Sequence, residues 1–152
     1  MASAVTQSVT SFVSLDDLLG GERVVQHTPR SPLEWVFLIR RGIPSAAVDA
    51  LTKLTSISQA ELAASLGIPE RTLARRKREG KLNSEESAKL VRLARAIARA
   101  EEVFEDRGRA VDWLKSVNPS LGGVTPLSLL DTDIGAEALM DTLGRIEHGV
   151  FA

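Results

Sequence analysis

The apolar residues of this chain recur at the three- to four-residue spacing of an α-helix, and the two-residue alternation typical of β-strands is nearly absent. Ser, Asp, Asn and Thr stand ahead of most apolar segments, where their side chains can cap a first helical turn. The longest predicted helix follows Asn83, where Glu86 completes a capping box, and it ends near Phe104. The pattern predicts an all-α protein.

The other expected elements are shorter. They are a turn capped by Ser14 and ended by Gly20-Gly21, helices over residues 32–41, 46–54, 59–66, 70–78 and 107–114, a turn after Thr125-Pro126, and a last helix from Asp131 or Thr132. The first of these helices contains LEWVFLI, residues 33–39, which is apolar almost all round. Such a helix is expected to be fully buried or to lie in a subunit interface. In the last helix, residues 139, 143, 146 and 150 share an apolar face.

Residues 59–81, QAELAASLGIPERTLARRKREGK, have the layout of a helix-turn-helix. The first helix presents a small residue, Ala63, where the second crosses it, and Gly67 suits the left-handed backbone of the turn. Pro69 stands at the start of the second helix, where its missing N–H costs nothing. The shared core is expected to hold Leu62, Leu66, Ile68 and Leu73. The second helix would then enter the major groove of DNA.

This second helix carries a dense row of cations. The predicted DNA-binding residues are Arg71, Thr72, Arg75, Arg76, Lys77, Arg78 and Lys81. The alternative is a solvated helix whose cations favour its C-terminal end. Five basic residues in eight positions are more than that alternative requires. Arg76 departs from the usual pattern, since an apolar core residue is common three positions after Leu73; either its head reaches solvent or the hairpin opens differently. Arg92, Arg95 and Arg99 are weaker evidence, better explained as a solvated face.

Charge is unevenly distributed along the chain, whose net charge is −1. Residues 1–57 carry five basic and five acidic side chains, residues 58–109 twelve basic and nine acidic, and residues 110–152 two basic and six acidic. A basic middle and an acidic end predict two different partners.

Composition narrows the function further. With no Cys, disulfide and thiolate chemistry are excluded. No apolar run approaches the roughly 20 residues of a membrane span, and the N-terminus lacks the features of a signal peptide, so a cytoplasmic protein is expected. His27 and His148 lack metal-ligand spacing, and neither a phosphate-binding glycine loop nor a catalytic set is present. We therefore expect no metal, no cofactor and no enzymatic activity.

The last third of the chain carries a series of short motifs. They are Trp113-Leu114, Asn118-Pro119, Leu121-Gly122-Gly123, Pro126-Leu127, Leu129-Leu130, Thr132, Gly135 and the closing LGRIEHGV at residues 143–150. These motifs resemble the toxin-binding domain of the Xre, MbcA and ParS antitoxins. Upstream, LGIPERTLARRKREGKLNSEESAKLVRLAR is similar to the Xre-type hairpin of the same antitoxins. The resemblance covers residues 42–152, roughly three quarters of the chain.

The resemblance implies a type II antitoxin paired with a RES-domain toxin that degrades NAD⁺. Members of that family neutralise the toxin by laying their C-terminal end over its NAD⁺ pocket, and they repress their own operon by binding an inverted repeat as dimers. A homodimer, a higher assembly with the toxin and binding to operator DNA are therefore expected. By position, the toxin contact falls on Leu143, Arg145, Ile146, Glu147, His148, Gly149, Val150 and Phe151.

The acidic closing segment suggests how such a contact works. A pocket for a pyrophosphate is rich in positive charge, so we hypothesise that Glu147 and the terminal carboxylate mimic phosphate. The simpler alternatives are an Asp141–Arg145 pair within the helix and a frayed end.

These observations divide the chain into three parts: an N-terminal segment over residues 1–42, a helix-turn-helix region over residues 43–105 and a toxin-binding domain over residues 106–152. The dimer contact is expected in the apolar helix of the first part and its neighbours. The alternative to an antitoxin is a stand-alone helix-turn-helix regulator whose C-terminal domain only oligomerises.

Overall fold

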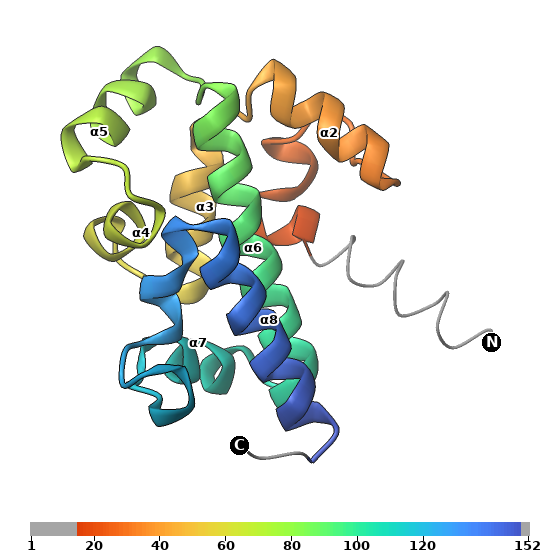
Figure 1. The fold of residues 1–152 in the computed structure, drawn as a ribbon. Helices are drawn as coiled ribbons and strands as arrows, with labels where there is room; N and C mark the ends of the chain where they lie inside the picture. The colour runs from red at the N-terminus through yellow and green to blue at the C-terminus, as the bar shows by residue number, and fades with distance from the viewer. Residues whose placement is uncertain (1–14, 150–152) are drawn as a thin grey trace.

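The computed structural model describes residues 15–149, which form helices around one long central helix (Figure 1). After a helical turn at residues 15–18, the elements are η1 (Gly21–Arg23), α2 (Pro32–Arg41), α3 (Ala46–Thr55), α4 (Gln59–Leu66), α5 (Glu70–Glu79), α6 (Ser84–Phe104), α7 (Arg107–Lys115), η2 (Pro119–Leu121), η3 (Pro126–Asp131) and α8 (Asp133–Glu147). Extended residues in this range pair only at two isolated bridges. The predicted all-α fold is confirmed. Between residues 15 and 149, no helix has the length and apolar character needed to cross a membrane.

The helix starts follow from side-chain caps. Ser31, Ser58, Asn83, Asp106 and Thr132 each accept a hydrogen bond from the backbone N–H three residues on, which satisfies a donor that the first turn leaves free. At α4 and α6 the third residue is a Glu that bonds back to the cap. The predicted capping box at Asn83 is thus confirmed, and Ser58 forms a second one. The predicted cap of the first turn, residue 14, lies outside the described residues.

Helix α6 is the centre of the core. Helical spacing predicts an apolar stripe of Leu90, Leu93, Ala94, Ile97, Ala100 and Phe104; the first five are buried and Phe104 is half-buried against the core. The helix contacts α2, α4, α7 and α8, and Figure 1 shows α8 lying along it. The described residues therefore share one core from the N-terminal turn to α8, and the division at residues 42 and 105 stays a prediction.

Helix α2 was predicted to be either fully buried or part of a subunit interface, and full burial is wrong. Trp35 and Leu38 are buried, but Leu33 is 60% and Phe37 48% exposed, so the helix is not fully buried. Its residues are apolar all round, yet only one side packs on the core. The remaining alternative, a subunit interface on the exposed side, stays a prediction.

Candidate functional sites: the basic hairpin and the closing helix

The hairpin of α4 and α5 is built as predicted. Leu62, Leu66, Ile68 and Leu73 are buried, together with Ala63 at the crossing. Gly67 has φ 66°, the left-handed conformation that a side chain disfavours, and the N–H of Ile68 donates to the carbonyl oxygen of Ala63 at 3.0 Å. The turn is therefore tight, and the outer face of α5 is left free of core contacts.

The cations of α5, together with Lys81 just after its end, fall into two groups: those with no ion-pair partner among the described residues and those with one. Arg71, Arg78 and Lys81 are exposed, and none of them takes part in an ion pair among the described residues. Arg71 and Arg78 are seven positions apart, so they lie on the same face about 10 Å apart along the helix. Thr72 is half-buried beside them. Cations without a partner on an exposed helix face are free to contact phosphates, and contact of these residues with DNA stays a prediction.

Three of the remaining predicted DNA contacts, Arg75, Arg76 and Lys77, have charged partners within the chain. Lys77 Nζ lies 2.8 Å from Asp49 Oδ1 and donates to Gln59 Oε1 at 3.0 Å, which joins α5 to α3 and α4. Arg75 Nε lies 3.4 Å from Glu79 Oε1, with about half of its side chain exposed. An exposed pair of this kind contributes little stability, so Arg75 can exchange Glu79 for a phosphate at low cost.

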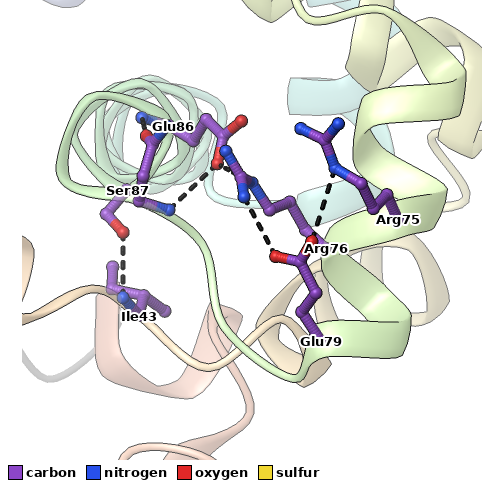
Figure 2. Close-up of polar contacts among 7 residues, drawn as sticks. Ile43, Arg75, Arg76, Glu79, Glu86 and Ser87 are labelled. Carbon is purple, nitrogen blue, oxygen red and sulfur yellow. Dashed lines mark hydrogen bonds and ion pairs between the residues drawn. The ribbon is translucent and has the colours of Figure 1, made fainter.

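Arg76 lies between α5 and α6 (Figure 2). Its Nε donates to Glu86 Oε1 at 2.8 Å and its Nη1 to Glu79 Oε2 at 3.0 Å. Glu86 is 7% exposed, and its Oε1 also accepts the N–H of Asn83 at 2.9 Å in the capping box. Arg76 therefore occupies the usual place of an apolar core residue by pairing with a buried carboxylate. Neither proposed explanation, a head extended to solvent or an altered opening of the hairpin, describes this arrangement.

The start of α6 is also joined to the connection between α2 and α3. The buried Ser87 Oγ accepts the N–H of Ile43 at 2.8 Å (Figure 2). Glu86 and Ser87 thus fix two different segments to the first turn of α6. Sequence analysis identified Glu86 only as a capping residue and missed its second role; the unexpected charge at position 76 was the available signal.

Two arginines of α6 hold α8 in place, so the expected solvated face is wrong for them. Arg92 donates to the carbonyl oxygen of Leu130 at 3.0 Å and also pairs with Asp133 at the start of α8. Arg99 donates to both carboxylate oxygens of Glu147, at 2.9 and 2.7 Å, near the end of α8. We call these two contacts the Arg92 clasp and the Arg99 clasp. Because their partners lie at the start and near the end of α8, they join both ends of α8 to α6.

The predicted toxin contacts fall into three groups. Arg145, Glu147, His148 and Gly149 are exposed, and Ile146 is half-buried. Leu143 is completely buried in the core, which corrects its prediction as a contact, because a partner cannot reach it in this conformation. The other two predicted contacts, at residues 150 and 151, lie outside the described residues. Within residues 15–149, Arg145 and Asp141 do not form the ion pair that was the simpler alternative.

Comparisons with known proteins match both halves of this arrangement. Residues 34–95 match the antitoxin Xre-like helix-turn-helix domain, and residues 99–149 match the antitoxin Xre/MbcA/ParS C-terminal toxin-binding domain. The chain is 37% identical over 116 residues to the antitoxin Xre of Yersinia enterocolitica, which covers 75% of this chain and 78% of that protein. The chain belongs to the Xre antitoxin family.

Two further relatives agree with this Xre-family assignment. The antitoxin Xre of Photorhabdus laumondii is 34% identical over 115 residues, covering 74% of this chain and 78% of that protein. A protein of Sphingobium sp. named Prs ADP-ribosylating antitoxin is 25% identical over 132 residues, covering 80% of this chain and 83% of that protein. This Xre-family antitoxin thus combines a helix-turn-helix DNA-binding domain with a toxin-binding domain.

The clasp at the end of α8 makes the stability of this Xre-family antitoxin depend on pH. The hydrogen bonds from Arg99 lower the pKa of Glu147 below its usual 4.5. A lowered pKa in the folded state contributes stability that is present above the ordinary pKa and lost as the pH falls through the lowered one. At neutral pH the wild-type chain should therefore melt above Glu147→Gln, and this gap should close in acid.

Thermal unfolding followed by circular dichroism at neutral and acidic pH measures this gap. Arg99→Gln is the matched variant, because it removes the other half of the same pair and should give the same convergence in acid. A gap between wild type and Glu147→Gln that stays constant across the pH range would show that the pair contributes nothing to the titration.

Proposed function

We propose that this antitoxin neutralises a RES-domain toxin by covering its NAD⁺ pocket with the closing end of α8. The observation that carries the proposal is the exposed surface at Arg145, Glu147 and His148, which lies at the end of the domain matched as toxin-binding. The hydrogen bonds from Arg99 place Glu147 at this exposed surface in the free protein. Inhibition by occlusion requires no catalytic group on the antitoxin.

A relative's name supports a partner that uses NAD⁺. The Sphingobium protein is named Prs ADP-ribosylating antitoxin, and ADP-ribose is transferred from NAD⁺. For the present chain we favour a toxin that degrades NAD⁺, and transfer of ADP-ribose to a protein is the competing chemistry. The match to a toxin-binding domain favours either of these over a stand-alone regulator.

Expression of the neighbouring reading frame tests the toxin proposal. Cellular NAD⁺ should fall sharply when that protein is expressed alone and should recover when this chain is expressed with it. Unchanged NAD⁺ together with ADP-ribose on cellular protein would replace degradation by transfer. Absence of both effects would contradict a partner that uses NAD⁺.

Phosphate mimicry by Glu147 requires that Glu147 can leave or share its partner within the chain. Glu147 already pairs with Arg99, so a cation of the toxin must replace or share that partner. Because the pair is more than one-third exposed on the Glu147 side, such an exchange costs little. Glu147→Gln should then weaken toxin binding. Undiminished binding would show that Glu147 does not mimic a phosphate.

We propose also that the antitoxin represses its own operon as a homodimer, with α5 of each copy in the major groove. The exposed face of α2, with Leu33 and Phe37, is the proposed dimer contact. The support for DNA binding is the row of free cations on α5, because phosphate contacts of this kind dominate the affinity of proteins for DNA.

Salt dependence checks the DNA-facing row. Arg71→Ala and Arg78→Ala should each flatten the slope of log affinity against log salt by about 0.9, since each removes one phosphate contact. Fluorescence anisotropy with operator DNA at several salt concentrations measures the slope. Arg23→Ala, an exposed arginine in η1, is the control and should leave it unchanged. If both α5 variants keep the wild-type slope and affinity, the row does not contact DNA.

A further inference from the structure

The loop between α7 and α8 has an unusual surface. Residues 116–130, SVNPSLGGVTPLSLL, contain no charged side chain, although 26% of the whole chain is charged. Val117 is 67% and Val124 40% exposed. In the described part of the domain matched as toxin-binding, Ile134 is the only other large hydrophobic side chain exposed to this degree. Exposed apolar groups without charged neighbours are typical of the centre of a protein interface.

Hydrogen bonds close the loop between Val117 and Val124. The N–H of Asn118 donates to the carbonyl oxygen of Val124 at 2.9 Å, and the N–H of Gly123 donates back to Asn118 at 3.0 Å. Asn118 Oδ1 also accepts the N–H of Ser120 at 2.9 Å. Gly122 and Gly123 both have φ 79°, which a residue with a side chain seldom adopts. The backbone that carries Val117 and Val124 is therefore closed on itself, so binding need not first order it.

The loop lies near the closing end of α8. Element η2 contacts α8, and Figure 1 shows the loop after α7 at the same end of the molecule as the end of α8. Ile134 is at the opposite end of α8, about 20 Å from Glu147 along the helix axis. The loop thus lies at the end of the molecule that carries the proposed toxin contact.

We infer that the uncharged loop that carries Val117 and Val124 is a second contact surface for the toxin, at the same end of the molecule as the closing end of α8. The inference rests on the proposed toxin binding. It adds that part of the antitoxin's contact surface is uncharged and apolar. DNA is a poor occupant, because the loop offers no cation to a phosphate. The toxin is the occupant that the domain match supports, since the loop lies inside residues 99–149.

Binding of the purified neighbouring protein to the full-length antitoxin tests the inference. Val117→Asp and Val124→Asp should each weaken binding tenfold or more, about the effect of truncating an interface hot spot. Both side chains are exposed, so each variant should keep the wild-type melting temperature and DNA affinity. Ile134→Asp places the same charge at a more exposed position, 79%, on the far end of α8 and should change the affinity less than about twofold, as energetically neutral positions do.

The outcomes separate this inference from the proposed function. If the wild-type chain does not bind the neighbouring protein, the proposed function fails. If the wild type binds, Arg145→Glu abolishes binding and both loop variants bind as the wild type does, only the loop inference is overturned. A loss as large for Ile134→Asp as for the loop variants would also overturn it. So would loop variants that alter the oligomeric state without altering toxin affinity, because the surface would then belong to a second copy.

Discussion

Gly135→Ala is expected to lower the free energy of unfolding by about 3 kcal/mol, the upper part of the range for overpacked sites. A Cβ at this position would lie 2.0 Å from the carbonyl oxygen of Leu129 and 2.9 Å from Thr132 Oγ1. The nearer atom belongs to the backbone of η3, so it cannot rotate away. The first turn of α8 must move off η3 to make room, and the Arg92 clasp at the same end is expected to loosen with it.

For a chain of this length, such a loss corresponds to a melting temperature lower by about 6–12 °C. Gly144→Ala is the matched control, because Gly144 lies in the same helix and a Cβ there meets nothing within 4 Å. It should raise the free energy of unfolding by up to about 1 kcal/mol through helix propensity. A Gly135→Ala variant as stable as the wild type would show that α8 does not start against η3 in solution.

Arg76→Met is expected to lower the stability of the fold, because it breaks the ion pair that Arg76 forms with the buried Glu86 carboxylate. Glu86 would keep its charge in a site that is 7% exposed, with only the capping N–H as partner. Helix α5 would lose its anchor on α6, so DNA affinity should fall while the salt slope stays as in the wild type.

Adding Glu86→Gln to Arg76→Met removes the buried charge and keeps the capping box, since Gln serves at this position as Glu does. The double variant should recover most of the lost stability, because replacing a buried pair by neutral groups is often harmless. Denaturant unfolding and salt-dependent DNA titration measure both quantities. A salt slope flatter by about 0.9 in Arg76→Met would show instead that Arg76 contacts a phosphate.

The helix boundaries and the hairpin were predictable because their signals are local. Ser58, Asn83 and Thr132 cap donors only three residues away, so a short window of sequence contains both partners. The buried set of the hairpin follows in the same way from helical spacing around Gly67. Such signals depend little on the rest of the fold.

The contacts of Arg92 and Arg99 with α8 were not predictable, because their partners are distant in sequence. Arg99 and Glu147 are 48 positions apart, and Arg92 and Asp133 are 41 apart. Sequence spacing places both arginines on one face of α6 but does not indicate that α8 lies over that face. The same limit explains Leu143, whose motif marks a family position while its burial depends on how α8 packs.

The central claim is that DNA binding and toxin neutralisation use separate surfaces, the outer face of α5 and the closing end of α8. The most direct test measures operator affinity, together with cellular NAD⁺ during expression of the neighbouring protein, for the full chain carrying Arg71→Ala/Arg78→Ala or Arg145→Glu. The α5 variant should lose DNA binding and still restore NAD⁺, whereas Arg145→Glu should bind DNA normally and fail to restore it. If either variant loses both functions while remaining folded, or if Arg145→Glu restores NAD⁺ as the wild type does, the account is contradicted.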